Sequence, residues 1–457
     1  MRKIIFAGLA QVLLVLGGCG GGGGSGIVPS NNNNNNNNGN GNGGAANVVS
    51  MIVDGGPDAS NPDVDTPFVT VMVCAPGSTS NCVTIPDVEV DTGSYGLRII
   101  SSALSSTFVA SLTQENASNG NPLVECTQFV DGYSWGPVMQ ADVHIGGESA
   151  GSVPIQVIGD SSFENEIPSA CSGTGTQEDT VASFGANGII GVGPFAQDCG
   201  SGCVLSNSTY AANPWYYACP AGGSTATSCQ AAGPNVQQQV TNPVADFTAS
   251  GDDNGVIIEL PSVPDPDGAA SATGSLIFGI GTQGNNGLGN ATVLSGNPSS
   301  GDITTTYSGT NGSNNLPYSY LDTGSNAYYF DVTNTTSISD CPSSGSSGTG
   351  GFSSSWVCPT SEQTINLTNS GANGPTSNVS IRIFNANTLF AENNGTFSAF
   401  DNLGADTGSQ STYCNKYFTI NGDCYFDFGL PFFFGRNVYV AIDGANTAGG
   451  KGPYFAY

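Results

Sequence analysis

The chain has 457 residues, of which 38% are hydrophobic and only 9% are charged. Its 35 acidic residues far outnumber its 7 basic ones, and the formal net charge of −28 argues against binding to nucleic acid or to anionic membrane surfaces. The single histidine, His144, excludes metal sites built from several histidines, and we expect no metal and no cofactor. Carboxylates therefore remain as the main candidate catalytic groups.

The N-terminus has the pattern of an export signal. Two basic residues precede an apolar run, Ile4 to Leu16, that is too short for a stable membrane span. Leu16-Gly17-Gly18-Cys19 resembles the lipobox of bacterial lipoproteins, which implies a signal peptide over residues 1–18 and lipidation of Cys19. An ordinary secretory signal is the alternative. Residues 19–47, rich in Gly and Asn, are expected to be a flexible tether. The expected location is the bacterial cell envelope, anchored by lipid in the outer membrane and facing the periplasm or the surface.

The cysteines favour an oxidising compartment. Thirteen are present, and setting Cys19 aside leaves an even number, as expected for a disulfide framework in an exported chain. Short loops close at the lowest entropic cost, so neighbours in sequence are the expected partners, although the four cysteines between residues 199 and 229 have other possible pairings. Zinc binding is disfavoured because paired C-x-x-C spacings do not occur. The expected disulfides are Cys74–Cys82, Cys126–Cys171, Cys199–Cys203, Cys219–Cys229, Cys341–Cys358 and Cys414–Cys424.

From residue 48 the chain has the pattern of an all-β protein. Short runs of β-branched and aromatic residues recur between Gly, Pro, Asn and Asp. Helical periodicity is scarce, and Ser101–Leu112 is the best candidate for a short helix. Many short strands separated by turns predict sandwiches or barrels. The clearest predicted strands, in chain order, are Phe68–Val73, Val153–Ile158, Val256–Leu260, Ser275–Ile280 and Val438–Ile442.

Two copies of one motif are the candidates for chemistry. Asp91-Thr92-Gly93-Ser94 follows a predicted strand that contains Val88 and Val90. Asp322-Thr323-Gly324-Ser325 follows Tyr320-Leu321 in the same way. A third copy, Asp406-Thr407-Gly408-Ser409, lies in a polar stretch, so we interpret it as coincidental.

An apolar segment with a glycine follows each of the first two motifs. The first is Gly188-Ile189-Ile190-Gly191-Val192-Gly193, and the second is Phe432-Phe433-Phe434-Gly435 with the strand after it. Together with residues 274–281, this order resembles the pepsin-like aspartic peptidases over residues 66–457, and most closely an uncharacterised bacterial lipoprotein branch known as a domain of unknown function. In pepsins the later strand threads the loop that presents each aspartate, and the resemblance gives this role to the strands with Gly191 and Gly435.

The resemblance implies an all-β, bilobal pepsin-like fold with an active-site cleft between two β-barrel lobes. We expect the lobes to span residues 48–285 and 286–457 of a monomer. Asp91 and Asp322 are the implied catalytic pair, because two adjacent carboxylates cannot both ionise and so provide an acid and a base at one pH.

The remaining motif residues have supporting roles in the family. The threonines cross-link the two loops, the glycines allow a close approach of backbone to carboxylate, and the serines bond the outer carboxylate oxygens. In this chain these residues are Thr92, Thr323, Gly93, Gly324, Ser94 and Ser325.

Three features depart from the pepsins. The hairpin that carries a flap tyrosine in that family matches Phe129–Gly136, where Tyr133 or Trp135 is the candidate flap aromatic; alternatively, these side chains only pack the hairpin. Arg98 stands near a position where pepsins often carry an aromatic residue. Arg98 is expected to pair with a structural acid or, alternatively, to lower the pKa values of the Asp91–Asp322 pair, called the dyad below. The stretch between Cys19 and Asp91 contains no basic residue to match the basic prosegment of pepsin zymogens.

Three functional hypotheses follow. The first is a lipid-anchored aspartic endopeptidase that hydrolyses an extended peptide in the interlobe cleft. The second is a non-catalytic lipoprotein that binds a peptide or glycan on the same scaffold, since a fold does not fix a function. The third, a structural or adhesive surface protein, leaves the paired motifs unexplained. For the peptidase we expect an activity optimum below neutral pH, because protonation relieves the repulsion among the many acids.

Overall fold

The computed structural model describes residues 45–130, 132–204, 214–220, 225, 228–249, 251–309, 312–332, 335, 338–342, 355–392, 395–407 and 425–457. The predicted signal peptide, Cys19 and most of the predicted tether lie outside these residues. Strands dominate the described part, so the expected all-β class is confirmed. None of its helices is both long and apolar enough to cross a membrane. The helices are α1 (Ser106–Val109), α2 (Ser169–Ser172), α3 (Val181–Phe184) and α4 (Ala386–Glu392), with 3-10 turns at Ser101–Ala103, Glu164–Glu166, Gly200–Val204, Val236–Gln238, Pro243–Asp246 and Leu430–Phe432.

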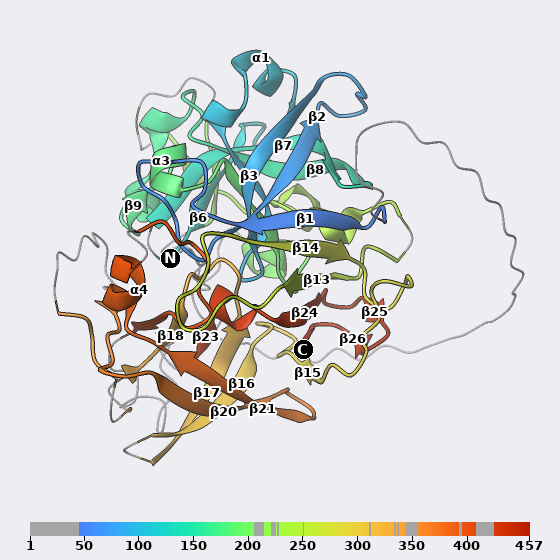
Figure 1. Cartoon of the computed structure of the whole chain (residues 1–457). Helices are drawn as coiled ribbons and strands as arrows, with labels where there is room; N and C mark the ends of the chain where they lie inside the picture. The colour runs from blue at the N-terminus through green and yellow to red at the C-terminus, as the bar shows by residue number, and fades with distance from the viewer. Residues whose placement is uncertain are drawn as a thin grey trace, which may run out of the picture.

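A central sheet joins the two halves of the chain. Figure 1 shows its strands β1, β14, β13 and β24 between the blue and green upper half and the yellow to orange lower half. Neighbouring strands in this layer are antiparallel throughout. In spatial order the strands are β1 (Val48–Val53), β14 (Ala272–Phe278), β13 (Gly255–Leu260), β24 (Arg436–Ala441), β27 (Tyr454–Ala456) and β15 (Val293–Ser295).

The first lobe is built on a long hairpin and its neighbours. β7 pairs with β8, β2 and β6, and β1 connects these strands to the central sheet through β2. The strands are β2 (Pro67–Cys74), β3 (Cys82–Asp91), β4 (Tyr95–Ile100), β5 (Thr113–Gln114), β6 (Leu123–Gln128), β7 (Gly132–Ile145), β8 (Glu148–Ile158), β9 (Thr176–Gln177), β10 (Gly188–Val192), β11 (Tyr216–Ala218) and β12 (Gln230–Ala231).

The second lobe is a separate 8-stranded sheet. Its strands are β16 (Ile303–Gly309), β17 (Gly312–Leu321), β18 (Tyr328–Phe330), β19 (Ser355–Trp356), β20 (Gln363–Ser370), β21 (Thr376–Ile383), β22 (Gly404–Asp406) and β23 (Asp427–Phe428). A small hairpin, β25 (Asn446–Thr447) with β26 (Gly450–Lys451), stands apart. The boundary expected after residue 285 does not coincide with a boundary between sheets, because β15, β24 and β27 pair within the central sheet.

One apolar core runs through both lobes and the central sheet. It contains Val88 and Val90 before the first motif, Leu321 before the second, and Val438 and Val440 of the central sheet. The residues before each aspartate are fully buried, which fixes the strand ends that present the carboxylates. The two motifs therefore share one packed interior.

The disulfides follow the expected pattern of sequence neighbours. Five of the six expected pairs are formed, and Cys414–Cys424 lies outside the described residues. Such bonds belong to an oxidising compartment. The five pairs are Cys74–Cys82, Cys126–Cys171, Cys199–Cys203, Cys219–Cys229 and Cys341–Cys358.

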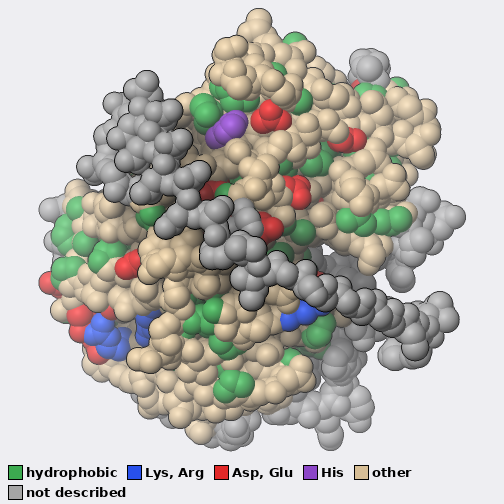
Figure 2. All heavy atoms as spheres, turned by 90° about the vertical axis from the view of Figure 1, so that its right-hand side faces the viewer, with side chains coloured by type: hydrophobic (Ala, Val, Ile, Leu, Met, Phe, Trp, Pro, Cys, Tyr) green, Lys and Arg blue, Asp and Glu red, His purple; other side chains and the backbone are tan. Residues whose placement is uncertain are grey.

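Each of the five clearest predicted strands overlaps an observed strand; three agree to within two residues at both ends, whereas β8 begins five residues and β14 three residues before the predicted start. The predicted helix at Ser101–Leu112 is wrong in extent. The segment forms a 3-10 turn and the four-residue helix α1, because Ser105 breaks the run and caps α1 through its side chain. On the face shown in Figure 2, hydrophobic side chains are scattered among neutral polar surface, and Val204 is the one large hydrophobic residue exposed in the described part.

Candidate active site

Both aspartates stand where a buried strand ends. Asp91 is the last residue of β3, and Asp322 directly follows β17. Neither residue has exposed surface in this state of the molecule, whereas Gly93 is partly exposed. The structure thus places both sequence-predicted catalytic residues at equivalent points of the two lobes.

A short strand threads the first aspartate loop, as the sequence predicts. β10 lies between β3, to which it is parallel, and β4, to which it is antiparallel. Gly191 stands opposite Asp91 on one side and Gly96 on the other. A Cβ atom at Gly191 would lie 2.5 Å from the carbonyl carbon of Ser94, so the loop closes around this position only if it is glycine.

The second loop has the same arrangement, but with a different strand from the one predicted. β23 is parallel to β17 and antiparallel to β18, which makes Gly429 the counterpart of Gly191. A Cβ atom at Gly429 would collide with the carbonyl oxygens of Ser325 and Ala327. The prediction of Gly435 is wrong, because Gly435 follows a 3-10 turn and leads into β24 of the central sheet.

The two aspartate loops are tied together by reciprocal threonine hydrogen bonds. Thr92 Oγ1 donates to the carbonyl oxygen of Leu321 (2.9 Å) and accepts from the backbone N–H of Thr323 (3.0 Å). Thr323 Oγ1 likewise donates to the carbonyl oxygen of Val90 (2.6 Å) and accepts from the N–H of Thr92 (3.0 Å). All four bonds are buried, so the loops hold each other in one register.

The motif glycines bring each loop against the carboxylate of the other. A Cβ atom at Gly93 would lie 2.5 Å from Cγ of Asp322, and one at Gly324 would lie 2.7 Å from Cγ of Asp91. Each glycine also donates its N–H to Oδ1 of the aspartate two residues before it, at 2.7 Å for Asp91 and 2.9 Å for Asp322. The close approach expected at these glycines is therefore present on both sides.

The outer carboxylate oxygens differ. Ser325 Oγ bonds Asp322 Oδ2 at 2.9 Å, as expected. On the other side, Ser94 Oγ and Asp91 Oδ2 are buried and form no hydrogen bond of normal geometry among the described residues, although Ser94 is close enough to lower the pKa of Asp91. The carbonyl of Ser94 accepts from the N–H of Gly193, which fixes this loop by its backbone. Asp91 Oδ2 is thus the dyad oxygen without a well-placed protein donor.

The electrostatics of the pair follow from burial and like charge. Burial raises the pKa of Asp91 well above its usual value, and the neighbouring Asp322 carboxyl raises it further. Burial also raises the pKa of Tyr95, the residue after the first motif, and the nearby acids Asp302, Asp91 and Asp322 add to this effect. The site therefore favours a state in which the carboxyl pair keeps a proton at pH values where an exposed aspartate has lost it.

Asp427 joins this site, although the sequence did not single it out. It lies on the threading strand β23, and Ser325 Oγ stands 2.7 Å from its Oδ2 as well as 2.9 Å from Asp322 Oδ2. One hydroxyl has one hydrogen to donate, so one of these two carboxyls has to carry a proton. Because Asp322 also accepts from Gly324 N–H, we assign Ser325 as the donor to Asp322 and Asp427 as the donor to Ser325.

If the site cleaves peptides, we expect Asp427→Asn to keep the cleavage rate within about threefold of the wild type, because an amide N–H replaces the carboxyl O–H as donor to Ser325. Asp427→Leu, of similar size but with no polar group, is expected to shift the pH profile of cleavage, because Ser325 then loses the donor that holds its hydroxyl toward Asp322. Measured pH profiles of kcat/KM test this assignment. A large loss of activity in Asp427→Asn would show instead that the charge of Asp427 is required.

The free energy of unfolding is expected to fall as the pH rises from 4 to 8. Burial raises the pKa values of Asp91, Asp65 and Asp198 well above the usual value, so the folded chain keeps protons that the unfolded chain releases near pH ~4. A raised folded pKa stabilises the fold below the unfolded pKa, and this contribution is lost as the pH rises through the folded pKa. Urea unfolding across this range measures the slope. Asp65→Asn should flatten it, and a steady rise in stability would contradict the prediction.

The candidate flap aromatics pack the hairpin β6–β7. Trp135 Nε1 donates to the carbonyl oxygen of Phe163 (3.0 Å), and the Trp135 ring packs edge-on against Tyr217 (5.3 Å between centroids). Tyr133 Oη donates to Gln177 (3.2 Å). Because Tyr133 and Trp135 are two residues apart on one strand, both point into a small core that contains two disulfides. This supports the packing alternative rather than the flap role.

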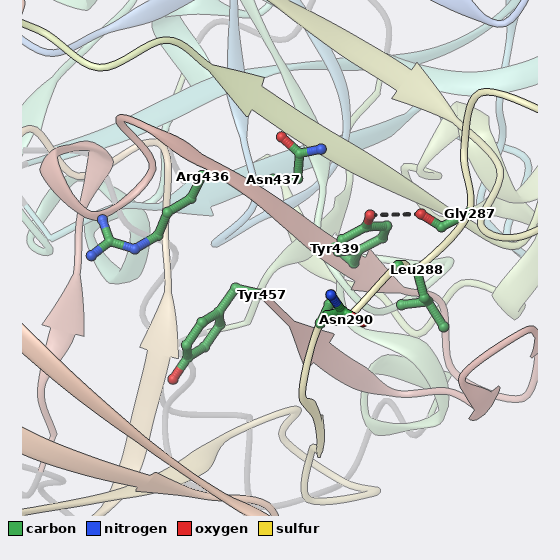
Figure 3. Close-up of a pocket in the computed structure, with 9 residues that line it drawn as sticks. Gly287, Leu288, Asn290, Arg436, Asn437, Tyr439 and Tyr457 are labelled. Carbon is green, nitrogen blue, oxygen red and sulfur yellow. Dashed lines mark hydrogen bonds between the residues drawn. The ribbon is translucent and has the colours of Figure 1, made fainter.

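Two other candidate sites lie apart from the dyad. Figure 3 shows a surface pocket of 450 Å³ with Arg436, Asn437 and Tyr439 of β24 on one side and the segment around Leu288 on another; it includes no residue of either aspartate motif. Glu166, Cys219 and Cys229 form the one group of potential metal ligands in the described residues. The two cysteines are joined in a disulfide, so their sulfurs are not thiolate ligands.

Sequence reasoning missed Asp427, Gly429 and the buried acids around Arg98. A signal for Gly429 was available, since Phe428-Gly429 is also an apolar residue followed by glycine after the second motif. A two-residue strand leaves no periodicity to support it. The acids Glu125 and Asp198 had no signal, because their burial depends on contacts between distant segments.

Known proteins that are similar to this chain include a family profile and solved structures. A search of curated proteins finds no match. Among solved structures, the aspartic proteinase from Irpex lacteus is similar, with 16% sequence identity, a TM-score of 0.45, and coverage of 90% of this chain and 96% of that one. A family profile described as "Protein of unknown function (DUF3443)" matches residues 43–457. This match takes in both aspartate motifs and both lobes, and the chain belongs to that family.

Proposed function

We propose that the protein is an aspartic endopeptidase of the pepsin-like superfamily. The observation that carries the proposal is the reciprocal bonding of Thr92 and Thr323, which places Asp91 and Asp322 at matching positions against the opposite loop. A structural protein would have no need for two buried carboxyls in contact, since such a pair costs stability. An acid and a base side by side are what peptide hydrolysis needs.

The hydrogen bonds suggest how the pair divides the work. Asp322 accepts from Gly324 N–H and Ser325 Oγ, and we assign it the role of the base that takes a proton from water. Asp91, with a raised pKa and an unbonded Oδ2, holds the proton that polarises the peptide carbonyl. The hydroxide oxygen then attacks the carbonyl carbon, and a proton passes to the amide nitrogen as the C–N bond breaks. The two carboxyls titrate as a pair, and the pH profile reports on both together.

Burial of the dyad sets a condition on this activity. Asp91 and Asp322 have no exposed surface, so a substrate reaches them only after the cleft opens. The substrate is expected to be an extended peptide in the interlobe cleft, bound by a monomer. An association rate that is slow for a peptide inhibitor would fit such an opening step.

A non-catalytic binding protein is the second candidate. It is favoured by the same burial and by the packing of Tyr133 and Trp135 into the hairpin core, which leaves the hairpin without the expected flap aromatic. On this alternative the cleft holds a peptide or glycan without turning it over. The two candidates differ in whether cleavage depends on the carboxyl pair.

We further propose that the mature chain is a lipoprotein of the bacterial cell envelope, anchored through Cys19 in the outer membrane. The lipobox-like sequence before Cys19 and the five disulfides support this location. Replacing Cys19 with Ala should release the chain from membranes into the soluble fraction. Retention of the Cys19→Ala protein in the membrane would contradict lipidation at this residue.

Cleavage of denatured proteins tests the enzymatic proposal. The exported chain, with its disulfides intact, would be incubated with a denatured protein mixture from pH 3 to 7, with and without a pepstatin-like statine inhibitor. Cleavage that the inhibitor blocks establishes an aspartic peptidase. If the folded chain cleaves nothing at any pH, the peptidase proposal is contradicted and the non-catalytic binding protein is favoured.

A further inference from the structure

A second buried cluster of charged groups lies close to the first aspartate loop. Arg98, on β4, donates from Nε to Glu125 Oε2 (3.2 Å) and from Nη2 to Glu125 Oε1 (2.7 Å). The same Nη2 lies 3.2 Å from Asp198 Oδ2. None of the three side chains has exposed surface. The expectation that Arg98 pairs with a structural acid is confirmed, and it pairs with two.

The charges of this cluster balance only if one carboxyl holds a proton. A single guanidinium faces two carboxyls, and an uncompensated buried charge costs several kcal/mol. Glu125 receives two N–H groups of Arg98 in a fork, so it is the main partner of the guanidinium charge. Asp198 has one longer contact with Arg98, and the Tyr216 hydroxyl donates to its two oxygens (2.8 and 2.9 Å). Burial and the neighbouring Glu125 outweigh these contacts and raise the pKa of Asp198 well above its usual value, so the proton belongs on Asp198.

The cluster joins the dyad loop to the hairpin β6–β7. Arg98 Nη1 donates to the carbonyl oxygen of Tyr95 (2.8 Å), directly after the first motif, and Arg98 Nε donates to Thr127 Oγ1 on the hairpin (2.9 Å). Gln156 extends the network, because its Nε2 donates to the carbonyl oxygen of Glu125 (3.0 Å) and its Oε1 accepts from Ser134 Oγ (2.9 Å). Both strands of the hairpin are thus bonded to groups that pack against the dyad loop.

We propose that Arg98 is a positioning residue that fixes the hairpin Leu123–Pro137 to the first aspartate loop, and that Asp198 is the proton-holding member of the cluster, so that the hairpin loosens when this proton is lost. The proposal rests on and deepens the proposed peptidase function, because Arg98 bonds the hairpin to the loop that carries Asp91. Its main test does not depend on catalysis.

The expected direction follows from the groups that face Asp198. These are Arg98 from β4, Glu125 from β6 and Tyr216 from β11. When the hairpin is closed, Asp198 keeps its proton; when the hairpin opens, Asp198 meets water and loses the proton near pH ~4. Opening therefore becomes easier as the pH rises, by up to about tenfold per pH unit while the closed form still holds the proton.

Hydrogen exchange of the intact chain, followed by mass spectrometry from pH 4 to 8 and corrected for the intrinsic rate, measures this opening. We expect protection of residues 123–137 to fall as the pH rises in the wild type and to be nearly independent of pH in Asp198→Asn, where an amide imitates the protonated acid. The strands β13 and β14 serve as an internal reference for global unfolding. Asp253→Asn, at an exposed aspartate, is the matched control and should behave as the wild type.

Two results would overturn the proposal. One is the same pH dependence of hairpin protection in Asp198→Asn as in the wild type. The other is hairpin protection equal to that of β13 and β14 at every pH, because the hairpin would then open only by global unfolding. Arg98→Lys tests the positioning role separately, since it keeps the charge but loses the fork; if it folds, hairpin protection should fall about tenfold or more at every pH. If the wild type cleaves peptides, Asp198→Asn should also extend the alkaline limb of kcat/KM. If the wild type does not cleave peptides, the peptidase proposal fails, but the hydrogen-exchange result still tests the proposal about Arg98 and Asp198.

Discussion

Asp91→Asn and Asp322→Asn are each expected to reduce the rate of peptide cleavage by roughly three orders of magnitude or more, because each removes one member of the acid and base pair that acts as a unit. The measurement is kcat/KM on one peptide substrate at the pH optimum of the wild type. Thermal unfolding of Asp91→Asn should match or exceed that of the wild type. A neutral amide suits a buried site that already raises the pKa of Asp91.

The chain supplies its own matched control for this experiment. Asp406 begins a third copy of the same four-residue motif, but it is the last residue of β22 and does not belong to either aspartate loop. Its Oδ1 accepts from the backbone N–H of Val332. Asp406→Asn should leave cleavage nearly unchanged. Residual cleavage at the wild-type rate in either dyad variant would exclude the proposed mechanism, and equal losses in all three variants would point to damage to the fold.

The part of the site that the sequence predicted correctly is the part that depends on local pattern. Each dyad motif follows apolar residues that end a buried strand, and the first threading strand is an apolar run with Gly191 at its centre. The second threading strand has no such pattern. β23 is two residues long and contains the polar Asp427, so the longer run Phe432–Phe434 before Gly435 gave a stronger but misleading signal.

The hairpin shows a second limit. Its alternation predicts that Tyr133 and Trp135 share one face, but not what each face contacts. The opposite face carries Ser134 together with Glu125 and Thr127 of the paired strand, and Arg98 packs against it. A pattern of polar residues assigns such a face to solvent. In the structure that face is buried too, and its charges are satisfied by partners from distant parts of the sequence. Only tertiary contacts reveal this kind of burial, whereas disulfides between near neighbours follow from loop closure alone.

Thr92→Val and Thr323→Val are each expected to lower the free energy of unfolding by about 2–5 kcal/mol. Valine has the shape of threonine but leaves two buried groups without partners: in Thr92→Val these are the carbonyl of Leu321 and the N–H of Thr323. Urea unfolding at one pH measures the loss. Thr92→Ser and Thr323→Ser keep the hydroxyl and should stay close to the wild type.

The double variant, Thr92→Val with Thr323→Val, tests whether the two threonines hold the aspartate loops of the two lobes together. The two threonines bond the same pair of loops, so the loops can separate once one hydroxyl is removed. Removing the second hydroxyl then lowers the free energy of unfolding by a smaller amount. The combined loss should therefore be smaller than the sum of the single losses. Valine variants within about 0.5 kcal/mol of the wild type would show that the loops are held by strand packing instead. In that case the register of the carboxyl pair would rest on the threading strands β10 and β23 rather than on the threonines.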